Sequence, residues 1–378
     1  MIIDGHNYCF PQMDHPQGYD TLGEKMRMLQ SEYGGHYQPV WRVRDRAPAD
    51  NSVLVDPETG ELRDIRWTRH NGNIAWEYEG EVYAKQHTPP MLHNLECPAE
   101  VMLAEMDYAG VDMGVLHTYP TMGHPTHLNA YLRDITTRFP DRFRRTVYLR
   151  EASIPNDPEA AIKALDRELA AGGVVGYQFI PGYYYAPSGG VEVGHEEPWD
   201  DGPMRPFWDA LAERNVPVYF TLIGGSAGGA YRASWTDTYM QEQRALIRWM
   251  ERYPHLTTMI THGLPWIPFM EGDEIVFPEE IWEPFQSPKC YMQIVIVIQV
   301  GRRWEYPWKE AESAIQECLE RVGADRLIWG TDMPMVARFC TYTQCLDQFR
   351  RHCDFLTDEQ RADILGGTAA RLMGIEAP

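Results

Sequence analysis

The sequence predicts a (β/α)₈ barrel with a long insertion after the first strand. From residue 98 onward, short apolar stretches alternate with helical segments, as is typical of parallel strands joined by helical crossovers. Eight strands can be counted, and the roughly 290 residues outside the insertion suit a barrel of about 250 residues or more. A doubly wound open sheet is the alternative. No G-x-G-x-x-G follows the first strand, which disfavours a nucleotide site of that fold.

The first strand carries three ionisable side chains on one face. After the apolar Met1-Ile2-Ile3, alternation places Asp4, His6 and Tyr8 on the same side of the strand. Burying three such groups is costly unless they have a use there. In the alternative interpretation, Asp4 caps a turn and His6 is a hydrogen-bonded core histidine.

Residues 12–97 differ from the rest in being polar, aromatic and rich in arginine. Two hairpins are predicted there: 53–56 with 62–67, and 74–78 with 81–83. We treat this segment as an insertion in a single barrel domain of residues 1–378. Because it leaves the C-terminal end of the first strand, we expect a lid over the barrel mouth or a dimer contact. A solvated hairpin with no such role is the alternative.

The remaining elements follow in regular order. Strands are predicted at 114–118, 146–150, 174–179, 217–221, 256–262, 290–300 and 326–331. Helices are predicted at 98–108, 127–139, 157–171, 204–214, 240–253, 309–322, 341–352, 357–365 and 368–373. Active sites of such barrels form at the C-terminal strand ends. The polar residues at those ends are His6, Tyr8, His117, Arg150, Glu151, Gln178, Thr221, His262, Gln299 and Asp332.

Composition limits the partners. Asp and Glu total 55 against 34 Lys and Arg, a net charge of −21, which opposes binding to nucleic acid or anionic membranes. No apolar run is long enough to span a membrane. The seven cysteines include no C-x-x-C pair. With no leader sequence recognised, we expect reduced thiols in a cytoplasmic protein.

Several motifs make the chain resemble the amidohydrolase superfamily. They are Ile3-Asp4-Gly5-His6, Thr261-His262-Gly263, Trp329-Gly330-Thr331-Asp332-Met333-Pro334, the segment 200–220 and the tail 364–374. The branch that they resemble contains aminocarboxymuconate-semialdehyde decarboxylase and γ-resorcylate decarboxylase. The resemblance implies a barrel that holds zinc or manganese and acts on small, often carboxylated rings. It also implies metal-ligand histidines in an H-x-H on the first strand and at the end of the fifth, with an aspartate ending the eighth.

The implied ligand set is only half present. His6 and Asp332 match metal positions, and His262 matches the acid/base histidine, whereas Tyr8 and Thr221 stand where the family has ligand histidines. A tightly held zinc needs at least three protein ligands. Tyr8 could serve as a phenolate only once a metal is present, because its reference pKa is about 10. Asp4 could be a third ligand or could orient His6. A divalent metal and a metal-free site both remain open.

We therefore predict a carboxy-lyase for a small carboxylated aromatic or enol/keto acid, with His262, Asp332 and Tyr8 catalytic. Arg338 is a candidate carboxylate clamp or else a surface arginine, and Gln178, Thr221 and Trp266 are candidate substrate contacts. One alternative is a metal-dependent hydrolase of a small ring or amide. Another is a metal-free pseudo-enzyme kept for binding or assembly, which the survival of His262 and Asp332 disfavours. We expect a homodimer or a higher homo-oligomer.

Overall fold

Eight parallel strands form the centre of the molecule. The computed structural model describes residues 1–36, 38–185, 194–222 and 235–375. The sheet order follows the chain: β1 (Ile3–Asn7), β7 (Met113–Leu116), β8 (Phe143–Tyr148), β9 (Val174–Phe179), β10 (Val218–Phe220), β11 (Thr258–Ile260), β14 (Cys290–Ile294) and β15 (Leu327–Trp329). Every neighbouring pair is parallel, and a bridge from Asn7 to Met333 joins the last strand to the first. The predicted (β/α)₈ barrel is confirmed.

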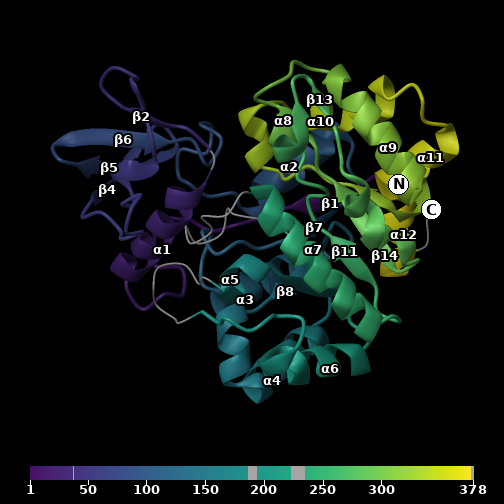
Figure 1. Ribbon diagram of the computed structural model, residues 1–378. Helices are drawn as coiled ribbons and strands as arrows, with labels where there is room; N and C mark the ends of the chain where they lie inside the picture. Colours follow the sequence, from purple (N-terminus) through teal and green to yellow (C-terminus); the bar gives the residue numbers. More distant parts are fainter. Residues whose placement is uncertain (37, 186–193, 223–234, 376–378) are drawn as a thin grey trace.

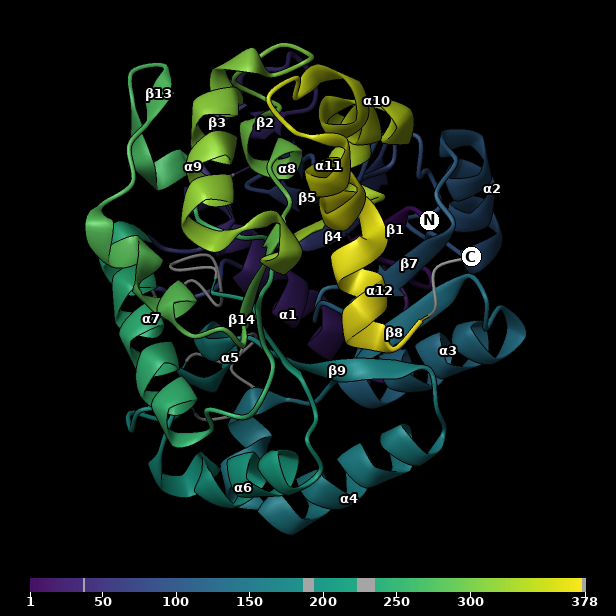
Figure 2. The ribbon, with the colours of Figure 1, turned by 90° about the vertical axis from the view of Figure 1, so that its right-hand side faces the viewer.

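Helices surround the sheet on the outside (Figure 2). They are α2 (Ala99–Ala109), α3 (Pro125–Arg138), α4 (Pro158–Ala170), α5 (Pro181–Tyr185), α6 (Arg205–Glu213), α7 (Trp235–Arg252), α8 (Val297–Val300), α9 (Glu312–Val322), α10 (Tyr342–Asp347), α11 (Asp358–Ala362) and α12 (Thr368–Met373). Local sequence sets their ends. The Asp157 carboxylate accepts from the backbone N–H of Ala160 to begin α4, and Gly110 ends α2 in the left-handed region with φ 80°.

The seventh strand is shorter than predicted. It ends at Ile294, and Val297–Val300 form the short helix α8 in place of the expected strand to residue 300. The prediction failed because a buried apolar run fits a strand and a helix equally well, and only its surroundings decide between them.

The insertion forms its own antiparallel sheet, in the order β3 (Pro48–Ala49), β2 (Val40–Arg42), β6 (Glu81–Lys85), β5 (Asn73–Tyr78) and β4 (Arg66–His70). The predicted second hairpin is confirmed as β5–β6. The predicted first hairpin is much shorter than expected: its arms meet in one antiparallel bridge, Val55 to Leu62, with a backbone hydrogen bond from Arg63 to Leu54 at 2.9 Å, and β4 pairs with β5 instead.

Helix α1 (Leu22–Gly35) was not predicted, although the sequence carries its signals. The Thr21 hydroxyl caps it by accepting from the N–H of Glu24, and Met26, Leu29 and Tyr33 are buried at helical spacing. Its polar residues tie it to the barrel. Nζ of Lys25 donates to the carbonyl of Pro120 at 3.3 Å, and the Tyr183 hydroxyl donates to Glu32 at 2.7 Å.

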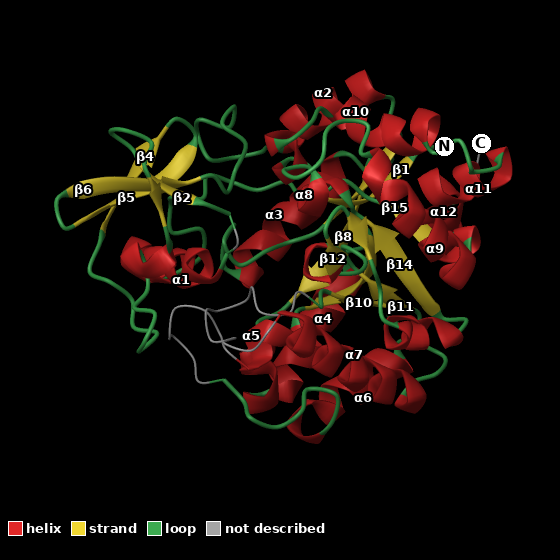
Figure 3. Cartoon of the chain, turned by 45° about the horizontal axis from the view of Figure 1, so that its top comes forward, coloured by secondary structure: helices red, strands yellow, loops and turns green. Residues whose placement is uncertain are grey.

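The insertion lies at one end of the barrel, opposite the N-terminus and α12 (Figures 1 and 2). Coloured by secondary structure, its sheet and α1 stand beside the main body (Figure 3). The chain leaves and re-enters the barrel through a bridge in which Phe10 and Cys97 exchange two backbone hydrogen bonds, each 2.9 Å long. This position brings insertion residues to the C-terminal strand ends.

All seven cysteines are free thiols, and six of them are buried. In the described parts of the chain, no helix combines the length and the apolar character needed to cross a membrane.

Candidate active site

The first and last strands are joined by the Asp4 carboxylate. It accepts from the backbone N–H groups of His6 and Thr331 at 3.0 Å each, and from the hydroxyls of Thr331 at 2.5 Å and Tyr342 at 2.6 Å. Burial raises the pKa of Asp4 to about 6 despite these donors. Asp4 is therefore occupied in holding β1 to β15. Its contact with His6 is to the backbone and does not orient the ring.

Gly330 allows the two strands to approach. A Cβ atom at this position would lie 2.9 Å from Cβ of His6 and 3.0 Å from Val295. The backbone N–H of the next-but-one residue, Asp332, donates to the carbonyl of His6 at 2.8 Å. In this motif, Gly330 thus lets the strands approach, Thr331 binds the Asp4 carboxylate, and Asp332 supplies a side chain to the site.

A directed chain of hydrogen bonds fixes the tautomer of His6. The carbonyl of Gly5 can only accept, so Gln293 presents its Nε2 to it at 2.7 Å and its Oε1 to Nδ1 of His6 at 2.7 Å. Nδ1 of His6 must therefore carry the proton. Burial, together with His117 and His262, lowers the pKa of His6 well below its usual value. The neutral ring consequently directs the lone pair of Nε2 into the site.

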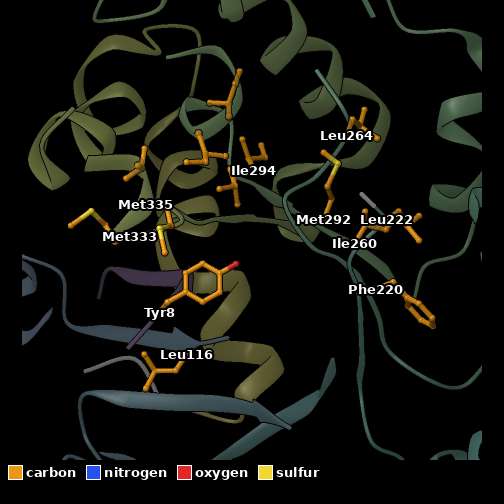
Figure 4. Close-up of a cluster of buried hydrophobic side chains, with 14 of the residues drawn as sticks. Tyr8, Leu116, Phe220, Leu222, Ile260, Leu264, Met292, Ile294, Met333 and Met335 are labelled. Atoms are coloured by element: carbon orange, nitrogen blue, oxygen red, sulfur yellow. The ribbon is translucent and has the colours of Figure 1, made fainter. Parts of the chain in front are cut away.

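Tyr8 donates its hydroxyl to that lone pair, at 2.7 Å from Nε2 of His6. Burial and the nearby Asp332 raise the pKa of Tyr8 well above its usual value, so the phenol stays protonated. Its ring belongs to a buried apolar cluster that also includes Met333 and Met335 (Figure 4). Tyr8 is therefore a fixed hydrogen-bond donor.

His262 and Asp332 meet at the ends of the sixth and eighth strands. Nε2 of His262 lies 3.1 Å from Oδ1 of Asp332, and the same oxygen lies 3.6 Å from Nε2 of His6. Both residues have left-handed backbones, with φ 59° at His262 and 66° at Asp332. Non-glycine residues rarely adopt this conformation, and where they do it often marks a functional site.

His117, at the end of the second strand, completes the cluster. Its ring stacks on that of His6 with centroids 3.9 Å apart, and its Nε2 donates to the carbonyl of Gly5 at 3.1 Å. Burial and the nearby His262 lower the pKa of His117 to about 3. Three imidazoles and one carboxylate thus share the strand ends.

The donor set fits a divalent metal. One ligand atom each from His6, His262 and Asp332 lies within 4.8 Å of the other two. Imidazole nitrogens and a carboxylate are ligands that zinc and manganese accept, and the Nε2 lone pair of His6 is already oriented by Gln293.

An open pocket of about 920 Å³, including its solvent-exposed part, covers this cluster. Of the residues predicted to form the site, Tyr8, Thr221, His262, Asp332 and Arg338 line it. The hydroxyl of Thr221 lies 2.7 Å from that of Thr261.

Two predicted substrate contacts lie elsewhere. Neither Gln178 nor Trp266 lines the pocket in the described part of the chain. The Gln178 amide bonds Thr118 and Thr146 within the barrel, and the buried Trp266 packs on Phe277. Their sequence positions beside strand ends were compatible with the site, but their side chains are used in packing.

Sequence reasoning missed Gln293, which contacts His6 beneath the pocket, and two histidines of the insertion, His36 and His87, which line the pocket. Gln293 was overlooked because its strand was expected to end at residue 300. His36 and His87 carried no local signal: the insertion was expected at the barrel mouth, but its sequence did not indicate which of its residues reach the pocket.

Comparisons with known proteins agree with the fold. Among solved structures, 5-carboxyvanillate decarboxylase from Novosphingobium aromaticivorans, complexed with manganese and 4-hydroxy-3-methoxy-5-nitrobenzoic acid, is similar at 19% identity and a TM-score of 0.52. The match covers 75% of this chain and 82% of that chain. The 2,6-dihydroxybenzoate decarboxylase from Rhizobium is similar at 18% identity and a TM-score of 0.53, and the match covers 74% of this chain and 89% of that chain. A protein assigned as a 2-pyrone-4,6-dicarboxylic acid hydrolase from Pseudomonas putida is similar at 18% identity and a TM-score of 0.54, and the match covers 76% of this chain and 90% of that chain.

No curated protein matches the chain. A family model described as Amidohydrolase matches residues 43–375, which include His262, Asp332 and seven of the eight barrel strands. The chain therefore belongs to the amidohydrolase family and is an enzyme of the lyase or hydrolase kind.

Proposed function

We propose that this enzyme is a carboxy-lyase for a small carboxylated aromatic or enol/keto acid, with His262 and Asp332 as its acid/base groups. The observation that carries the proposal is the 3.1 Å contact between the two side chains in the pocket wall. Two similar structures are decarboxylases of 5-carboxyvanillate and 2,6-dihydroxybenzoate, which supports an aromatic carboxylate as substrate.

His262 is suited to deliver a proton. With Nε2–H directed at Asp332, the cationic ring carries its second proton on Nδ1, a buried atom that has no hydrogen-bond partner among the described residues, so the ring must turn to present this proton to the pocket. Transfer of this proton to the ring carbon that bears the carboxylate leaves His262 neutral. Cleavage of the C–C bond then releases CO₂ and returns the bonding pair to the ring. Asp332 stabilises the cationic imidazole before transfer.

Two further side chains assist. The protonated Tyr8 hydroxyl can stabilise an oxyanion that develops on the substrate once its proton turns from Nε2 of His6 toward the ligand. Arg338 lines the same pocket and can pair with a carboxylate. With His262 neutral instead, a divalent ion held by His6, His262 and Asp332 would polarise a substrate oxygen or activate a water molecule, and His262 would then not be the proton donor.

The test is a panel of hydroxybenzoates and benzene dicarboxylates incubated with the protein in D₂O. We expect CO₂ release and a product with one deuterium at the carbon that lost its carboxylate, detected by NMR. A ring-opened or hydrolysed product without CO₂ would overturn the proposal.

A second candidate is metal-dependent hydrolysis, favoured by the grouping of His6, His262 and Asp332. In H₂¹⁸O, hydrolysis places ¹⁸O in the organic product and decarboxylation does not. Metal analysis, with activity measured before and after chelation, shows whether either reaction needs the ion. Loss of stoichiometric zinc or manganese together with all activity, restored by adding the ion back, would contradict a metal-free mechanism.

A further inference from the structure

The insertion places two histidines in the pocket wall next to a barrel arginine. His36 follows α1, and His87 follows β6 by two residues. Their ring centroids lie 5.0 Å apart. Nη1 of Arg338 donates to the carbonyl of His87 at 2.5 Å, which joins the barrel to the insertion here. All three side chains line the pocket that contains His262 and Asp332.

The charges around these side chains are positive. Burial lowers the pKa of both histidines, and Lys85 and Arg338 lower each further. Nζ of Lys85 donates to the carbonyl of His36 at 2.6 Å and to Oδ1 of Asn51 at 2.9 Å, which are neutral acceptors. An anion that enters this part of the pocket is therefore attracted to it.

The histidines also offer hydrogen-bond donors. Nδ1 of His36 accepts from the backbone N–H of Gln38 at 3.2 Å, so the neutral ring carries its proton on Nε2. His87 is 7% exposed, and its buried Nδ1 has no hydrogen-bond partner within the described residues. A buried polar atom left without a partner costs free energy, which an oxygen of a bound ligand would recover in the tautomer that carries the proton on Nδ1.

We propose that His36, His87 and Arg338 form an anion subsite that binds a second carboxylate of the substrate, separate from the one that is removed. This inference rests on the proposed function and narrows its substrates to dicarboxylates. The insertion then completes the substrate site.

The test is equilibrium binding, which does not depend on turnover. Benzoate and the benzene-1,2-, 1,3- and 1,4-dicarboxylates are titrated into the full-length protein by calorimetry. We expect at least one dicarboxylate to bind ten times more tightly than benzoate. Arg338→Met and His87→Phe should each weaken that dicarboxylate at least tenfold and remove most of its advantage over benzoate. His87→Asn, which retains a side-chain N–H near the position of Nδ1, should recover most of the affinity.

Matched controls are Arg27→Met on α1 and His93→Gln in the insertion, both at exposed positions. They should leave the preference unchanged, and thermal unfolding of each variant checks that it is folded. If no dicarboxylate binds more than twofold tighter than benzoate, or if Arg338→Met and His87→Phe leave the ratio intact, the subsite is wrong. His262→Asn separates the two proposals, because it should keep the preference whether or not any turnover is detected.

Discussion

Nε2 of His262 lies 3.1 Å from Oδ1 of Asp332, although the two residues are 70 positions apart and both have left-handed backbones. The contact exists because the sixth and eighth strands end at the same face of the barrel. Gln293, on the strand between them, accepts from the backbone N–H of His262 at 3.4 Å and from the ring of His6. The Gln293 side-chain amide thus links its own strand to His6 on the first strand and to His262 at the end of the sixth.

Replacing His262 by Asn should remove the proton donor with little effect on folding, because Asn tolerates positive φ. We expect kcat on any substrate found in the screen to fall by about 10²- to 10⁴-fold, as is usual for loss of a general acid. His255→Asn, at an exposed position, is the control. Unchanged turnover in His262→Asn would remove this residue from the mechanism.

The left-handed backbone at Asp332 predicts an unusual order of stability. Asp332→Gly should be more stable than Asp332→Ala by about 1 kcal/mol, because alanine pays the steric cost of positive φ and glycine does not. Denaturant unfolding of the pair measures the difference. At the exposed helical position Asp134, the same comparison should favour alanine. A preference for alanine at both positions would show that the backbone of Asp332 is unstrained.

Gln293→Leu should leave the tautomer of His6 unfixed, because no acceptor then holds the proton on its Nδ1. We expect the affinity for Mn²⁺, measured by calorimetry, to fall by about 10- to 100-fold. Gln178→Leu also removes a buried amide from a neighbouring part of the barrel, without contact to His6. It should therefore lose comparable stability but keep its metal affinity. Equal affinities in the two variants would refute the role of Gln293.

Glu151 predicts a pH dependence of stability. Burial raises its pKa to about 8 from a usual value near 4.5, so the folded state favours the protonated form. Its contribution is complete below pH 4.5 and is lost as the pH rises toward 8. Relative to Glu151→Gln, the wild type should therefore lose on the order of a few kcal/mol over this range. Glu159→Gln, at an exposed position, should show no such change. A difference that does not vary with pH would contradict the raised pKa.

The sequence was sufficient for the fold class and for the residues at the strand ends. Alternating apolar and helical segments dictate parallel strands, and parallel strands bring their C-terminal ends to one face whatever the details of packing. His6, Tyr8, His262 and Asp332 could therefore be placed together before any coordinates. The expected oligomer and the lid role of the insertion stay predictions.

Tertiary structure decided what those residues contact. Gln178 and Trp266 also lie near strand ends, but packing directs them away from the pocket, whereas Gln293 is turned toward His6. The insertion was expected at the barrel mouth, but contacts between distant segments, such as Glu32 with Tyr183 and Arg338 with His87, decide which of its residues meet the barrel. Local sequence patterns indicate which face of a helix or strand is buried. They do not indicate which distant side chain contacts that face, because the contact depends on the packing of the whole chain.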